Sequence, residues 1–146
     1  MFRTFFTFFI LLVSLSGCKS YESAQNGKDG NTEMELILRG DYSGFEDEQL
    51  LVINNKVQWE EFFGRINRTR KPGLTVPEID FEKNTIIIRL KGETTNNEPD
   101  VILGKVSNEA LVLKRNKNLA KGKSSAILTP FFVYTISKTD KSIKIQ

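Results

Sequence analysis

The side chains that could support catalysis in this chain are few, because the sequence contains no histidine. Without imidazole there is no Ser-His-Asp or Cys-His arrangement, no histidine metal site and no histidine proton shuttle. Carboxylates are densest at Glu46-Asp47-Glu48 and at Glu60-Glu61. A glycosidase needs two carboxylates that face each other about 5–9 Å apart across a cleft, and sequence neighbours do not provide that geometry. We therefore interpret both groups as solvated charge.

Three other segments have residue types that bind ligands, and each has a simpler interpretation. Lys121-Gly122-Lys123-Ser124-Ser125 lacks the spaced first glycine and the following helix of a phosphate-binding loop, so it is interpreted as a flexible basic loop. Residues 29–33 are only faintly like a calcium loop, since Met34 stands where an EF-hand has glycine. Trp59 could stack on a ligand, but its position favours a place in the core. We expect no enzyme activity, no cofactor and no metal site.

The only cysteine, Cys18, ends a motif with a different chemistry. Arg3 precedes an apolar run, which is the layout of a secretory signal, and Leu15-Ser16-Gly17-Cys18 resembles the lipobox of bacterial lipoproteins. The resemblance implies that a diacylglyceryl group is attached to the Cys18 sulfur and that the signal peptide, residues 1–17, is removed. A membrane-spanning helix is disfavoured, because Thr4 to Gly17 would give only about 21 Å of helix against a hydrocarbon core of about 30 Å. An ordinary signal peptide with a chance cysteine remains the alternative.

Lipidation would place the protein in the bacterial cell envelope, anchored to a membrane and outside the cytoplasm. Each buried methylene contributes about 0.8 kcal/mol, so two or three acyl chains anchor a protein firmly. The formal net charge of +3 is too even a balance for a dedicated nucleic-acid surface. The expected partners are therefore the membrane and another envelope protein, not nucleic acid.

Composition divides the rest of the chain into a tether and one domain. Residues 18–32 hold the modified cysteine and a small, polar stretch without apolar periodicity, as expected of a flexible tether. Residues 33–146 are expected to form the domain. Alternation, β-branched runs and turn residues predict strands at 34–38, 49–53, 85–90, 101–106, 111–113, 127–137 and 142–145. Pro130 interrupts the sixth of these and indicates an edge or a bulge there.

One helix is predicted between the second and third strands. Asn55 can cap it, with Gln58 in the reciprocal position. Trp59, Phe62, Phe63 and Ile66 recur at i, i+3, i+4 and i+7 and form one apolar face, and Pro72-Gly73 excludes continuation. The expected fold class is α+β, with a mostly antiparallel, curved β-sheet and one amphipathic helix.

Three stretches of this domain resemble the C-terminal domain of the protease complex subunit PrcB family, found in bacterial lipoproteins. They are residues 52–63, residues 77–92, which end at Gly92 just after the third predicted strand, and residues 130–136. The resemblance implies a non-enzymatic accessory role that assists or stabilises an exported protease complex. Many members carry a Pro-Thr-Gly-Gly-type loop after that glycine, reminiscent of peptidase-inhibitor domains. The matching loop here lacks the paired glycines and is the candidate partner contact: Glu93, Thr94, Thr95, Asn96, Asn97 and Glu98, followed by Pro99.

The sequence leaves several functions open. The preferred hypothesis is a lipid-anchored interaction module that binds an envelope protein, such as a peptidase. A peptidase inhibitor, a carboxylate-dependent hydrolase and a structural lipoprotein without a specific ligand are the alternatives. A plain solvated turn is the competing interpretation of residues 93–99.

Overall fold

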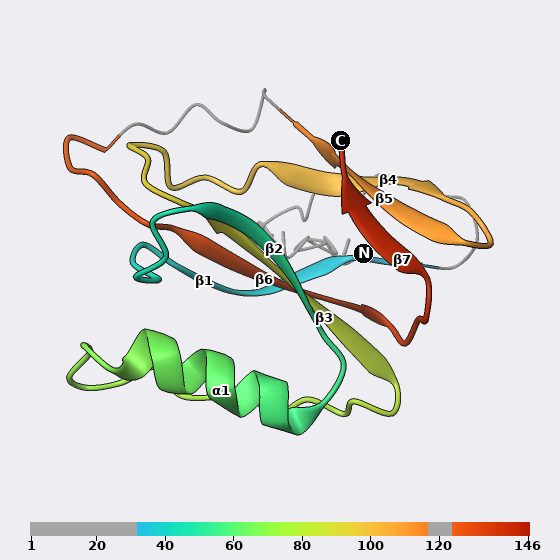
Figure 1. The fold of residues 1–146 in the computed structure, drawn as a ribbon, viewed down its shortest axis with the longest axis horizontal. Helices are drawn as coiled ribbons and strands as arrows, with labels where there is room; N and C mark the ends of the chain where they lie inside the picture. The colour runs from blue at the N-terminus through green and yellow to red at the C-terminus, as the bar shows by residue number, and fades with distance from the viewer. Residues whose placement is uncertain (1–31, 117–123) are drawn as a thin grey trace, which may run out of the picture.

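The computed structural model describes residues 32–116 and 124–146 (Figure 1). The predicted signal peptide, Cys18 and most of the predicted tether therefore lie outside the described residues, as do Lys121, Gly122 and Lys123 of the basic loop. Within the described part of the chain, no helix is long and apolar enough to cross a membrane.

The described chain forms seven strands and one helix. The helix is α1 (Lys56–Asn67), and the strands are β1 (Glu35–Gly40), β2 (Glu48–Ile53), β3 (Asn84–Lys91), β4 (Val101–Val106), β5 (Ala110–Arg115), β6 (Phe131–Ser137) and β7 (Ser142–Ile145). Each predicted element is present, with one correction. The strand expected at 127–137 begins only at Phe131, and Leu128 and Thr129 make isolated bridges instead. Pro130 has no N–H to donate to a ladder, which explains why the regular strand starts after it.

The strands are divided between two sheets, whereas the sequence predicts one. The central sheet has the order β1-β6-β3-β2 and is antiparallel throughout. The second sheet has the order β4-β5-β7, in which β4 and β5 are antiparallel and β5 and β7 are parallel. The α+β class with mainly antiparallel pairing is confirmed, and the expected curvature stays a prediction.

The central sheet is the middle of three layers (Figure 1). Six consecutive residues of β3 are buried, so this strand is covered on both faces. Because side chains alternate along a strand, Ile86, Ile88 and Leu90 pack toward α1. Ile87 points the other way, into the core that the central sheet shares with the second sheet.

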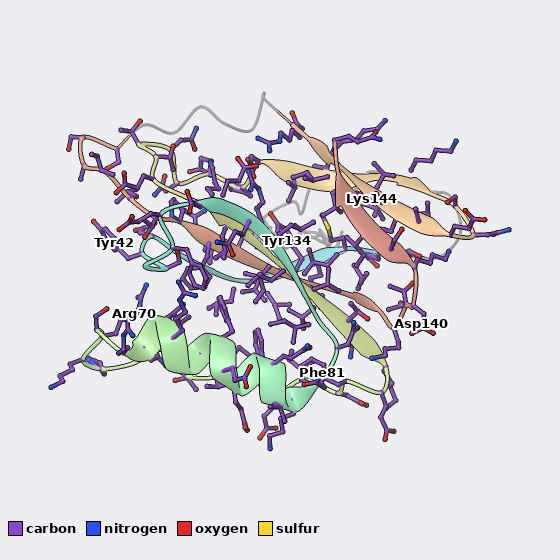
Figure 2. The ribbon with its side chains drawn as sticks, in the orientation of Figure 1. Tyr42, Arg70, Phe81, Tyr134, Asp140 and Lys144 are labelled. Atoms are coloured by element: carbon purple, nitrogen blue, oxygen red, sulfur yellow. The ribbon has the colours of Figure 1, made fainter. Side chains whose placement is uncertain are left out.

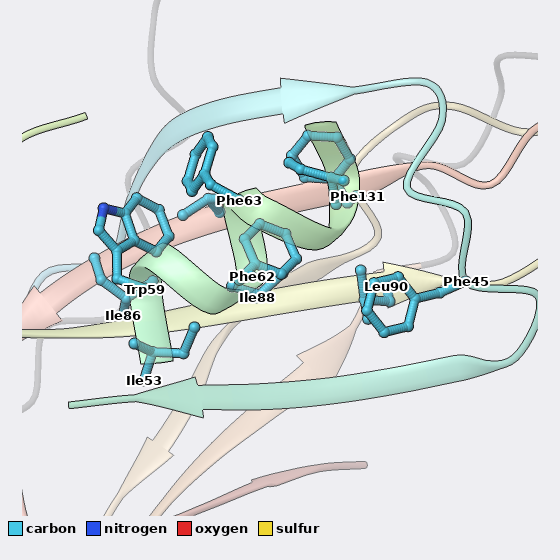
Figure 3. Close-up of a cluster of buried hydrophobic side chains, with 11 residues drawn as sticks. Phe45, Ile53, Trp59, Phe62, Phe63, Ile86, Ile88, Leu90 and Phe131 are labelled. Carbon is cyan, nitrogen blue, oxygen red and sulfur yellow. The ribbon is translucent and has the colours of Figure 1, made fainter. Parts of the chain in front are cut away.

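The helix covers one face of the central sheet with aromatic side chains (Figure 3). Trp59, Phe62, Phe63 and Ile66 are its buried residues, as predicted. The Asn55 Oδ1 atom accepts the Gln58 N–H at 2.9 Å, which confirms the cap. Trp59 is only 2% exposed, and its Nε1 donates to the Pro77 carbonyl at 2.9 Å. The interpretation of Trp59 as a core residue is thereby confirmed.

Candidate functional site

Three connections, residues 41–47, 92–100 and 124–130, lie together at one end of the central sheet, which we call the loop end (Figure 1). Backbone hydrogen bonds join them to one another. The N–H groups of Thr94 and Leu128 each donate to the other residue's carbonyl, at 2.9 and 2.8 Å. Ser43 N donates to Thr129 O at 2.7 Å, and Glu93 N donates to Glu46 O at 2.9 Å. The middle loop is therefore fixed to both of its neighbours.

The 92–100 loop, which contains all six predicted contact residues, is also bonded internally. The N–H of Asn96 donates to Thr94 Oγ1 at 3.1 Å, and the N–H of Glu98 donates to Asn96 Oδ1 at 2.9 Å. Side chains of this kind replace backbone partners in turns. Thr94 and Asn96 thus shape the loop from inside, while Glu93 and Thr95 are exposed.

Lys91, the last residue of β3, holds the loop through two side-chain hydrogen bonds. Its Nζ donates to Asn96 Oδ1 at 3.2 Å and to the carbonyl of Glu98 at 2.9 Å. Burial lowers the pKa of Lys91, since desolvation disfavours the charged form. At the surface, Asn97 Nδ2 donates to Asp41 Oδ1 at 3.3 Å, which adds a side-chain link to the neighbouring loop.

Gly92 joins β3 to this loop. Its φ of +68° lies in the left-handed region, which costs a side-chain-bearing residue free energy. A Cβ atom at this position would also lie 2.6 Å from the backbone oxygen of Glu46. Both observations require glycine where β3 ends.

Apolar side chains are exposed beside the loop. Tyr42, on the first connection, is 55% exposed, and Ile127, on the third, is 67% exposed. Figure 2 labels Tyr42 and Arg70 at the same end of the molecule, where the Arg70 guanidinium donates to the Tyr42 carbonyl. A shallow depression of about 420 Å³ lies between these two residues, over Ile66. The loop end therefore presents both apolar and polar groups to a partner.

A cluster of four charged side chains lies between the two sheets, close to the point where the 92–100 loop ends. Arg89, on β3, is 1% exposed and binds Asp100 with two hydrogen bonds, Nε to Oδ1 at 3.2 Å and Nη2 to Oδ2 at 3.0 Å. Its Nη2 also lies 3.1 Å from Glu48 Oε2, and its Nη1 donates to the Leu90 carbonyl at 2.9 Å. Arg115, at the end of β5, binds the same Glu48 carboxylate with both Nη atoms. The cluster joins strands of both sheets to the end of the loop.

The charges in this cluster stabilise one another. Burial alone would raise the pKa of Glu48, but hydrogen bonds from Arg89 and Arg115 outweigh it and hold that pKa below its ordinary value of 4.5. Burial would likewise lower the pKa of Arg89, yet hydrogen bonds to Asp100 and Glu48 keep it raised. Tyr134, on β6, is 4% exposed and its pKa is raised, first by burial and then by Asp100.

Glu46, Asp47 and Glu48 are all exposed, as the interpretation as solvated charge predicts, but Glu48 also accepts hydrogen bonds from the buried Arg89 and from Arg115. The interpretation is therefore incomplete for Glu48. It holds for Glu60 and Glu61, which are exposed on α1. Sequence reasoning missed Arg89, Asp100 and Arg115. The signal was present, because an arginine inside the run Thr-Ile-Ile-Ile-Arg-Leu, on a strand buried on both faces, requires a charged partner.

Among residues 32–116 and 124–146, no three acidic, histidine or cysteine side chains converge where they could hold a metal ion. The carboxylates of Glu48 and Asp100 are both engaged by arginine.

No protein-family description, curated protein or solved structure matches this chain. The resemblance to the PrcB family thus rests on the three sequence stretches alone, and function is inferred from the geometry of the loop end.

Proposed function

We propose that this chain is a lipid-anchored, non-enzymatic protein of the bacterial cell envelope that binds another envelope protein through the loop end. The observation that carries the proposal is the hydrogen bonding of the 92–100 loop to both neighbouring loops and to Lys91. Binding costs free energy when a surface must be ordered, and a loop that is already fixed avoids most of this cost.

The composition of the loop end supports the same proposal. A few interface residues contribute most of the binding free energy between proteins, and tyrosine is enriched among them. Tyr42 is exposed beside the loop. Glu93 and Thr95 present polar side chains that no described hydrogen bond requires for folding, so they are free to contact a partner.

An accessory role in an exported protease complex is the more specific form of this proposal. Its support is the resemblance of residues 52–63, 77–92 and 130–136 to the PrcB family. In the fold these stretches contribute to α1, β3 and β6, whose side chains form the core. The third of them begins at Pro130, the last residue of the 124–130 connection of the loop end.

The loop contact is tested with the double variant Glu93→Lys and Thr95→Arg. Both side chains are exposed, so the loop should fold while its surface charge and bulk change. We expect the partner recovered from gently crosslinked envelopes, and quantified by mass spectrometry, to decrease at least tenfold. Asn108→Arg with Glu109→Lys makes the same charge change on the exposed 107–109 turn and should leave recovery unchanged. Equal recovery with both pairs would exclude the loop end as the contact.

The anchor is tested separately, at Cys18. Cells supplied with labelled palmitate should label the wild-type chain but not Cys18→Ala, and the variant should keep residues 1–17 and migrate at a higher mass, because the resemblance implies that the signal is cut after lipidation. An unlabelled wild-type chain would overturn the assigned location.

A peptidase inhibitor is the second candidate, favoured by the same fixed loop, because a pre-formed loop can occupy a protease cleft without being ordered on binding. The purified chain should then inhibit an envelope protease directly, and replacing Thr94 to Glu98 with alanines should abolish inhibition. Binding of the protease without inhibition would exclude the inhibitor role and agree with the accessory role.

A further inference from the structure

The two edges of the central sheet differ in how well they are protected. Within the described part of the chain, β1 pairs only with β6, and its register shifts between Leu36 and Leu38, which marks an irregularity that breaks a straight edge. β1 also carries Arg39, and such charges discourage pairing with another strand. β2, at the opposite edge, pairs with β3 in six unbroken positions and continues Leu50-Leu51-Val52-Ile53 without proline or bulge. Among the described residues, β2 has no second neighbouring strand.

A groove of about 500 Å³ runs along the open side of β2, between this strand and α1. Its apolar part is formed by Leu51, Phe45 and Phe62, and the two phenylalanine rings, drawn in Figure 3, lie 6.5 Å apart. Unpaired backbone groups beside apolar pockets are the features that accept an added strand, since the backbone gives affinity and the pockets receive alternate side chains.

The groove lining carries one acidic and one basic side chain, Glu61 and Arg65. Within the described chain Glu61 makes no ion pair, whereas its neighbour Glu60 is paired with Lys56. The nearby cation, Arg65, is stacked on Phe45, with its guanidinium carbon 3.6 Å from the ring centroid. Glu46 and Asp47 add further acidic groups just before β2. Glu46, Asp47 and Glu61 together outnumber Arg65, so the net charge around the groove is negative and a complementary occupant carries positive charge.

We infer that the β2 edge is a second recognition site, which captures an extended peptide segment of a partner protein with alternating apolar and basic residues. The segment adds a strand to the central sheet beside β2. Its apolar side chains enter the groove toward Phe45 and Phe62, and a lysine or arginine lies near Glu61. This site deepens the proposed interaction role by stating the partner's chemistry, but it does not involve the loop end.

The probe is a short fluorescent peptide of alternating valine and lysine, added to the purified full chain. Fluorescence anisotropy should show saturable binding, and a matched peptide with proline at its centre should bind at least tenfold more weakly, because proline cannot donate to the edge. Amide exchange measured by NMR should slow at the outward N–H groups of β2 and stay unchanged on β1. Equal binding of the proline peptide would overturn the inference.

Charge is tested by Glu61→Lys, which should weaken binding of the probe about fivefold, since it replaces an attraction of an exposed pair with a repulsion. Glu60→Lys is the matched control, one residue along α1 and outside the groove lining, and should leave binding unchanged. Equal weakening by both variants would overturn the charge assignment.

The edge must also be open in the protein without the probe. If amide exchange showed the β2 N–H groups fully protected in the protein alone, the edge would already be occupied, by a second copy if sedimentation showed a dimer and by another part of the same chain if it did not. In that case the inference fails, while the loop-end proposal stands.

Discussion

The central sheet presents two different faces to its two neighbours. Toward α1 its buried side chains are apolar and pack against the aromatic residues of the helix, and the ring centroids of Phe131 and Phe62 lie 5.8 Å apart. Toward the second sheet, the same strands place the guanidinium of Arg89 and the hydroxyl of Tyr134 among apolar residues. The faces are built from alternate residues of β3 and β6, so they differ in chemistry but not in position along the chain.

The difference indicates a division of roles. Apolar burial stabilises a fold without fixing one orientation, because dispersion and hydrophobic contacts are not directional. Hydrogen bonds between Arg89 and Asp100 are directional, and they determine how the second sheet and the 92–100 loop lie against β3. We infer that the α1 face supplies most of the stability and that the other face positions the loop end.

The largest effect is expected from Phe63→Ala on the apolar face. Phe63 is 1% exposed, and removing a buried ring costs about 3–5 kcal/mol of unfolding free energy. Urea unfolding followed by circular dichroism measures the loss. Val57→Ala, on the same helix but 65% exposed, should change stability by less than about 0.5 kcal/mol. A similar loss from both variants would contradict the assignment of stability to this face.

Arg89→Met should cost about 3 kcal/mol, because it leaves Asp100 beside the core without its bidentate partner. The double variant Arg89→Met with Asp100→Leu removes both charges and should be more stable than the single variant. If the single variant were as stable as the exposed substitution Arg68→Met, the buried cluster would have no structural role.

Acid should weaken the polar face before it disturbs the apolar one. The pKa of Glu48 is lowered in the folded protein, so its contribution is complete above the ordinary value of 4.5 and is lost as the pH falls through the folded pKa. Asp80, paired with Lys83, is lowered in the same direction. Unfolding curves measured from pH 6 downward should therefore decline less steeply below pH 4.5 in Glu48→Gln than in the wild type. Parallel curves would refute the role of Glu48.

Tyr134→Phe should have the smallest effect. The hydroxyl is buried and, within the described residues, has no hydrogen-bond partner. Its removal avoids an unsatisfied polar group, so stability should stay within about 1 kcal/mol of the wild type or increase. A clear loss in thermal unfolding would show that the hydroxyl is bonded in solution.

The apolar face could be predicted from the sequence, because its signal is local. Trp59, Phe62, Phe63 and Ile66 follow helical spacing, and the run in β3 has strong β preference, so each element is specified by its own residues. The predicted α+β class followed directly from these elements.

The run in β3 indicated that Arg89 needs a charged partner, but the partners on the polar face could not be predicted, because its contacts join distant residues. Glu48 and Arg115 are 67 positions apart, and Glu48 could not be distinguished from Glu46 and Asp47 by composition. The division into two sheets was missed for the same reason. Leu111 pairs in parallel with Ile143, while the intervening β6 belongs to the other sheet, and such a crossing leaves no periodic pattern.

The placement of β1 has a mechanical consequence for an anchored chain. A tether would pull on β1 at Glu35, whereas a partner held at the loop end would pull beyond Gly40, at the opposite tip of the same strand. Tension would then run lengthwise along β1 and load its bonds to β6 together, in shear, instead of unzipping them one after another. A protein pulled between a membrane and a partner would resist that tension through the strand that joins them.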